Sequence, residues 1–121
     1  MRGDELENRL LEFAARVGKA VDALPNTRMG RHIAGQLIRC GTAAAPNYAE
    51  TCAAESRADF VHKLMFALKE LRESCCWIRL ITKADLLSPK QLSALLDENT
   101  QLCKIIARSI VTAKTKSAQS R

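Results

Sequence analysis

Apolar residues recur at steps of three and four along nearly the whole chain, a periodicity that one face of an α-helix satisfies. The first such series is Leu6, Leu10, Phe13, Val17, Val21 and Leu24. A half-buried strand would instead alternate apolar and polar residues, and no segment does so. The pattern therefore predicts an all-α protein.

Residues that typically begin or end helices divide the chain into separate helical segments. The first helix is expected to begin near Asp4 and to end at Pro25, because proline disfavours helical backbone in the residue before it. Asn26 or Thr27 is the expected N-cap of a second helix, which runs to about Ala54. This helix carries Ile33, Leu37, Cys40, Ala44 and Tyr48 on one face.

Pro46 lies inside the second helix. Proline removes a backbone hydrogen bond and collides with the preceding turn, so we expect a kink between Thr42 and Pro46.

Two further helices complete the pattern. Ser56, with Asp59 three residues later, is the expected N-cap of a third helix ending near Lys83. Ser88 and Pro89 start a fourth, because proline suits the first helical position, and it runs to about Ala113. Short connections make neighbouring helices antiparallel. We therefore expect an up-down-up-down four-helix bundle over residues 1–113 and a flexible basic tail over 114–121.

Composition limits the functional classes. A chain of 121 residues has the size of one domain, and its 47% apolar content exceeds that of disordered chains. Five unevenly spaced cysteines and a first segment without an apolar leader favour the reducing cytoplasm. The longest uncharged runs, such as Gly41–Ala49, are far below the ~20 residues that span a bilayer. We expect no membrane insertion.

Candidates for catalysis and metal binding are weak. The cysteines lack the paired spacing of a zinc site and are interpreted as core packing. His32 and His62 have no nucleophile at a recognisable spacing. Glu70 and Glu73 are interpreted as solvated or paired with cations. The sequence predicts no metal, no cofactor and no enzyme, and a small metal-dependent enzyme remains only a third hypothesis. Asn47, Glu50 and Glu73 are expected to have structural roles. The side chains of Asn47 and Glu50 are expected to hydrogen-bond the backbone groups that Pro46 leaves unpaired.

Basic residues are better organised. Arg28, Arg31, His32 and Arg39 fall on one side of the second helix, and no acidic residue lies between Ala23 and Ala49. Lys104 and Arg108 repeat this bias after Glu98. Phosphate backbones are natural partners for such surfaces, although a merely solvated face is an equal alternative. The nucleic-acid-binding residues we predict are Arg28, Arg31, His32, Arg39, Lys104 and Arg108.

The third helix is more apolar than one core requires. Its second apolar surface predicts self-association through Val61, Met65, Leu68 and Trp77.

The run QLIRCGTAAAPNYAE, followed by spaced Phe60, Leu64, Ala67 and Glu73, resembles the small four-helix-bundle proteins encoded in intervening sequences of bacterial large-subunit ribosomal RNA genes. The resemblance covers residues 6–112, with departures at Thr51, Cys40 and Glu70. Relatives of this fold include the accessory variability protein of diversity-generating retroelements, a basic homopentamer that binds nucleic acid and a reverse transcriptase. The resemblance implies a pentamer of four-helix bundles and no enzyme.

Two functions follow from these observations. The leading hypothesis is a homo-oligomeric scaffold that binds RNA or DNA electrostatically. The alternative is an adaptor whose positive surface docks an acidic protein, such as a reverse transcriptase.

Overall fold

The chain forms four long α-helices in a computed structural model, which describes residues 1–119 and their side chains through residue 116. The elements are α1 (Gly3–Asp22), α2 (Arg28–Ala49), the short 3-10 helix η1 (Glu50–Ala53), α3 (Arg57–Lys83) and α4 (Pro89–Gln119). Residues 1–119 contain no strand. The all-α prediction is confirmed.

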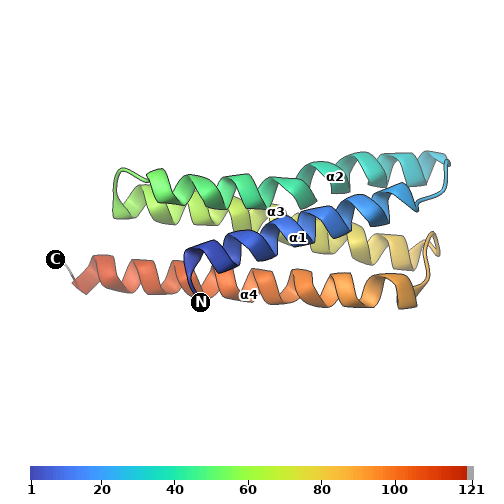
Figure 1. The fold of residues 1–121 in the computed structure, drawn as a ribbon. Helices are drawn as coiled ribbons and strands as arrows, with labels where there is room; N and C mark the ends of the chain where they lie inside the picture. Colours follow the sequence, from blue (N-terminus) through green and yellow to red (C-terminus); the bar gives the residue numbers. More distant parts are fainter. Residues whose placement is uncertain (120–121) are drawn as a thin grey trace.

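Consecutive helices run in opposite directions along the bundle (Figure 1). Each helix packs against the next one in the chain, and α1 also packs against α4, which closes the ring around the core. Over the described residues, the backbones of α2 and α4 do not come close to each other. They are diagonal partners, so their outer faces point to opposite sides of the molecule.

The apolar face of each helix packs into a common core. The largest fully buried side chains are Leu10, Phe13, Val17, Ile33, Leu37, Leu64, Leu71, Ile78, Ile81, Leu92, Leu102 and Ile106. In α1 the predicted stripe is buried from Leu6 to Val17, and Val21 and Leu24 pack against the core while half-buried. Burial of such side chains is the main force that holds the bundle together.

Side-chain caps fix three of the helix starts. The Thr27 hydroxyl accepts from the Gly30 amide at 3.1 Å, and the Ser56 hydroxyl accepts from the Asp59 amide at 3.0 Å, as expected. At α4 the Gln91 side chain also reaches back to accept from the Ser88 amide at 3.0 Å. Together with the 3.3 Å bond from the Gln91 amide to Ser88 Oγ, this makes a complete capping box.

The end of α2 differs from the expected one. The helix continues through Pro46 to Ala49 and gives way to η1, where the buried Thr51 hydroxyl donates to the Tyr48 carbonyl at 2.7 Å. Within residues 1–119 the side chains of Asn47 and Glu50 make no hydrogen bond to this backbone, so the structural role expected of them is not observed. The kink near Pro46 stays a prediction.

Gly41 allows α1 and α2 to approach closely. A Cβ at this position would lie 2.7 Å and 2.9 Å from the two γ-methyl carbons of Val17, a residue with no exposed surface. Carbon atoms do not approach this closely without displacement. The lack of a side chain at Gly41 therefore sets the separation of these two helices.

A buried amide joins α3 to α4. Asn99 has no exposed surface, and its amide, oriented to satisfy both groups, donates to the Leu71 carbonyl at 2.9 Å and accepts from the Cys75 amide at 3.0 Å. No sequence motif marks Asn99. Its spacing from Leu95 and Leu102, four and three residues away, was the available signal for burial.

The C-terminal boundary also differs. Helix α4 was expected to end near Ala113 but continues to Gln119, so most of the segment expected to be a flexible tail is helical. Residues 120 and 121 of that predicted tail lie outside the described residues.

Candidate nucleic-acid interface

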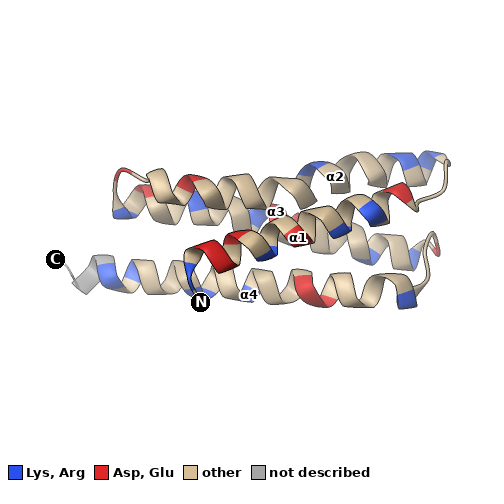
Figure 2. Ribbon diagram, viewed as in Figure 1, with Lys and Arg blue, Asp and Glu red and all other residues tan. Residues whose placement is uncertain are grey.

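The six basic residues predicted to bind nucleic acid do not form one surface on a single chain. Four of them lie on α2 and two on α4, and these helices are diagonal partners whose backbones stay apart in the described part of the chain. Because α2 and α4 run in the same direction, the start of α2 and the C-terminal half of α4 also lie toward opposite ends of the bundle (Figure 2). The predicted surface is therefore two separate regions.

The first region is the N-terminal end of α2, which we call the α2 basic end and which comprises Arg28, Arg31 and His32. All three side chains are exposed. Arg31 donates to the backbone and side-chain oxygens of Asn26 at 3.2 Å and 3.0 Å, which holds its guanidinium over the preceding loop. Neither arginine forms an ion pair within the described residues, so both keep their full charge toward solvent.

Arg39 has a different role from the one predicted. Its guanidinium forms ion pairs with two carboxylates of α3, Glu70 at 3.2 Å and Glu73 at a shorter distance. Glu73 in turn accepts from the Trp77 indole at 3.0 Å, and Trp77 stacks edge-on against His32 at a centroid distance of 5.6 Å. Two carboxylates outweigh one guanidinium, so this site does not attract phosphate. The expectation that Glu70 and Glu73 pair with a cation is confirmed.

The second region lies on α4. Lys104 and Arg108 are both exposed and one helical turn apart, and neither forms an ion pair within the described residues. Arg108 also borders a hollow of about 580 Å³ at one end of the bundle.

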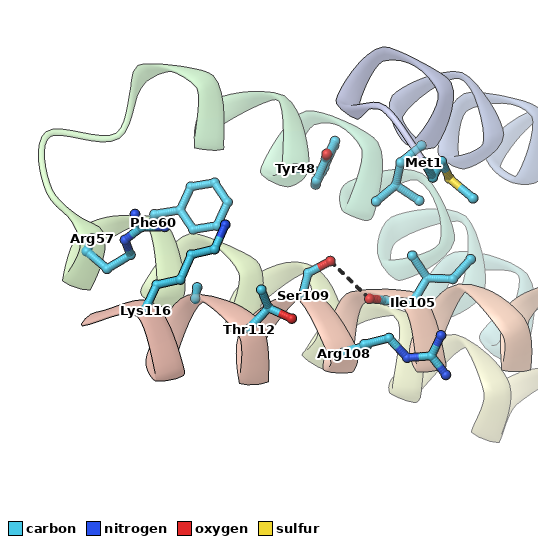
Figure 3. A pocket seen from close by; sticks show the side chains of 11 residues that line it. Met1, Tyr48, Arg57, Phe60, Ile105, Arg108, Ser109, Thr112 and Lys116 are labelled. Atoms are coloured by element: carbon cyan, nitrogen blue, oxygen red, sulfur yellow. Dashed lines mark hydrogen bonds between the residues drawn. The ribbon is translucent and has the colours of Figure 1, made fainter. Parts of the chain in front are cut away.

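We call this hollow the end groove (Figure 3). It is lined by Met1, Leu6, Tyr48, Arg57, Phe60, Ile105, Arg108, Ser109, Thr112, Ala113 and Lys116. Three of these residues carry positive charge and none carries negative charge. The cations are not gathered at one point, because Arg57 and Arg108 lie toward opposite ends of the groove with Lys116 between them (Figure 3). Sequence reasoning missed Arg57 as part of this site, since no local pattern connects the start of α3 with the end of α4.

The predicted self-association residues are only partly accessible. Met65 is 50% exposed, but Leu68 is only 7% exposed and belongs to the core of its own chain. Val61 and Trp77 are half-buried and pack against that core. Phe66, absent from the prediction, is 46% exposed and forms an apolar hollow of about 400 Å³ with Met65. The exposed apolar surface is therefore centred on Met65 and Phe66 rather than on the four predicted residues.

The cysteines are all free, and they are not all core residues as interpreted. Only Cys40 is buried, whereas Cys52 and Cys76 are exposed. Cys75 and Cys103 are half-buried and hydrogen-bond to each other between α3 and α4. Over residues 1–119, no three His, Cys, Asp or Glu side chains gather as the ligands of a metal ion would.

Comparisons with known proteins show the family of the chain. The model of the 23S rRNA-intervening sequence protein family matches residues 5–108. The chain belongs to that family. Both arginines of the α2 basic end lie within the matched range, as do Lys104 and Arg108, whereas Lys116 lies beyond it. The resemblance drawn from the run Gln36–Glu50 is confirmed for this family.

A solved structure supports the same placement. It is the 1.70 Å crystal structure of a protein with unknown function from the S23 ribosomal protein family of Bacteroides thetaiotaomicron. The two chains are 30% identical, with a TM-score of 0.81, and the alignment covers 87% of this chain and 97% of that chain. No curated protein matches this member of the intervening-sequence family. None of its described helices combines the length and the hydropathy needed to cross a membrane.

Proposed function

We propose that this chain is a homo-oligomeric scaffold without catalytic activity, a pentamer in the simplest case, which binds RNA or DNA electrostatically. The observation that carries the proposal is the α2 basic end. Arg28 and Arg31 are exposed and without an ion pair in the described part of the chain, and no carboxylate lies between Ala23 and Ala49. Exposed cations that form no ion pair release counterions from a phosphate backbone when they bind it.

Oligomerisation strengthens this proposal. A net charge of +6 gives one chain only weak affinity for a polyanion. A symmetric ring would present each basic region several times, and several weak contacts to one strand multiply the apparent affinity. The exposed Met65 and Phe66 supply an apolar face through which such a ring could close.

A double substitution tests the proposal. We expect Arg28→Glu with Arg31→Glu to abolish binding of a labelled single-stranded RNA and of a duplex DNA of equal length in filter-binding titrations. For the unchanged protein, the logarithm of the association constant should fall linearly with the logarithm of salt concentration, as counterion release requires. The matched control is Arg39→Gln, which removes a third arginine of α2 that is already neutralised. It should lower stability while leaving nucleic-acid affinity within about twofold.

Other results would reject the proposal. Absence of binding to either nucleic acid at low salt would do so. Equal losses for the Arg39 control and the double variant would also contradict it, because the charge of the α2 basic end would then not be the cause.

A second candidate function is an adaptor that docks an acidic protein. The retroelement accessory protein, which the resemblance implies as a relative of this fold, suggests a reverse transcriptase as that partner. The end groove favours this function, because its charged residues are all cationic. The five free thiols fit a reducing cytoplasm for either function.

A further inference from the structure

The end groove lies where a fourth helix is missing from the bundle. Helix α4 packs against α1 along part of its length, but α1 begins beside Tyr48, where a Cβ on Gly3 would lie 3.3 Å from the tyrosine oxygen. From Ile105, at the α1 end of the groove, α4 continues to Gln119, about 20 Å at ~1.5 Å per residue. Figure 1 shows the last turns of α4 running beyond the first turn of α1.

The groove therefore offers the site of a helix. Its walls are the end of α2 and the last turns of α4, and the first turn of α3 carries Phe60 into it (Figure 3). These walls belong to the same two helices between which α1 packs farther along the bundle. A helix laid into the groove would continue the line of α1, with its apolar face on surfaces already shaped for helix packing.

The residues that line the groove indicate which side chains a helix would need in order to bind there. The apolar lining includes the half-buried Phe60 and Ile105, together with Leu6 and Ala113, which are almost fully buried. The charged residues around it are Arg57, Arg108 and Lys116, with no carboxylate among the lining residues. A volume of about 580 Å³ falls within the usual ligand-site range of about 300–1,000 Å³.

We propose that the end groove binds an amphipathic helix of a partner protein, whose apolar side chains pack on Phe60 and Ile105 and whose flanking carboxylates pair with Arg57 and Arg108. This extends the adaptor function to a particular site, and it does not depend on nucleic-acid binding by the α2 basic end. Recognition of this kind uses apolar anchors one helical turn apart.

A peptide helix fits this site better than a nucleic-acid strand. A phosphate backbone would use the cations but would gain nothing from the half-buried apolar side chains of Phe60 and Ile105. The cations are also spread along the groove instead of converging on one point, which suits carboxylates on successive turns (Figure 3).

The test uses a designed peptide probe. The probe is a labelled helix of Leu, Ala and Glu with leucines at i, i+3, i+4 and i+7 and glutamates beside them, titrated by fluorescence anisotropy. We expect saturable binding that weakens with salt. A peptide of the same composition in scrambled order has the same charge but no apolar face, so its affinity should be at least about tenfold lower.

Protein variants locate the binding site. Thr112→Trp fills the groove without changing charge and should lower probe affinity at least about tenfold. Its matched control is Val111→Trp on the same helix, where the native side chain is 63% exposed and does not line the groove. That control should stay within about twofold. Circular dichroism melting curves confirm that both variants are folded.

Several results would contradict the proposal, and they can be told apart. Equal affinity for the ordered and scrambled peptides, or no effect of Thr112→Trp, would overturn the proposal. So would a loss of RNA binding in Thr112→Trp without any binding of the probe, because the groove would then serve nucleic acid. The variant Arg28→Glu with Arg31→Glu should keep full probe affinity, which separates this proposal from the nucleic-acid function.

Discussion

Cys75 and Cys103 show how a single contact between helices changes the chemistry of a side chain. A hydrogen bond from Cys103, helped by one from Thr100, lowers the pKa of the Cys75 thiol to about 7, against the opposing effect of burial. The same hydrogen bond, together with burial, raises the pKa of Cys103. Cys75 is therefore the thiol that ionises near neutral pH.

This difference predicts selective alkylation. Because the thiolate is the nucleophile, the rate of Cys75 modification by iodoacetamide should rise as pH passes through about 7. Cys103 should react slowly over the same range, since its thiol stays protonated. Peptide mass spectrometry after timed labelling at several pH values gives both rates. In Cys75→Ser the step near pH 7 should vanish, and a step that persists would assign it to another cysteine.

Residue-level prediction from sequence succeeded where the partner is local. The Thr27 and Ser56 caps involve residues three positions apart, so their spacing in the chain is enough to predict them. The ion pairs of Arg39 could not be predicted in this way, because its partners, Glu70 and Glu73, lie on another helix. Its position on the outer side of α2 was correctly deduced, but the periodicity of one helix does not show which face of α3 it meets.

Among the elements, the contact between α1 and α2 depends most on one residue. Gly41→Ala should destabilise the protein by about 1–3 kcal/mol, because the new methyl group would overlap the γ-methyl groups of the buried Val17. Chemical denaturation measures this change. The matched control is Gly35→Ala on the same helix, where a Cβ meets nothing within 4 Å. It should stabilise the protein by about 0.5–1 kcal/mol through helix propensity.

A double variant checks the cause. Combined with Val17→Ala, Gly41→Ala should cost less than the sum of the two single changes, by about 1 kcal/mol, because the overlapping methyl groups are gone. Simple additivity would show that Gly41 acts through something other than its contact with Val17.

The ends of the helices could also be predicted where they depend on nearby residues, and could not where they depend on distant ones. Capping residues correctly predicted the starts of α2, α3 and α4. The end of α4 was placed six residues too early, since the basic, polar sequence after Ala113 gives no apolar stripe to extend the helix. The end groove was likewise beyond prediction, because it depends on how far α1 and α4 each extend once they pack together.

At the scale of the whole molecule, the exposed Met65 and Phe66 need an explanation. Both project from the N-terminal half of α3, near Leu68, and a contiguous exposed apolar patch is a mark of an interaction site. The other two sequence-predicted residues, Val61 and Trp77, are half-buried beside the core and add less accessible surface.

Self-association through this patch predicts a clear change in mass. We expect the unchanged protein to elute as an oligomer in size-exclusion chromatography with light scattering, and Met65→Glu with Phe66→Glu to elute as a monomer. Charges brought into an apolar interface lose hydration, and pairing with Lys69 or Arg72 of the same hollow would offset this loss only in part. The matched control is Leu11→Glu on α1, where the native leucine is 54% exposed and outside the patch, and it should leave the mass unchanged.

The same variant links assembly to nucleic-acid binding. A monomer keeps Arg28 and Arg31 but presents them once, so its affinity for a long RNA should fall by at least about tenfold, while its affinity for a very short oligonucleotide should change little. Filter-binding titrations with RNAs of two lengths separate these effects. An equal loss for both lengths would mean that the apolar patch itself contacts RNA, and no loss for either would mean that one chain suffices. Only a length-dependent loss supports a scaffold whose modest charge becomes effective through repetition.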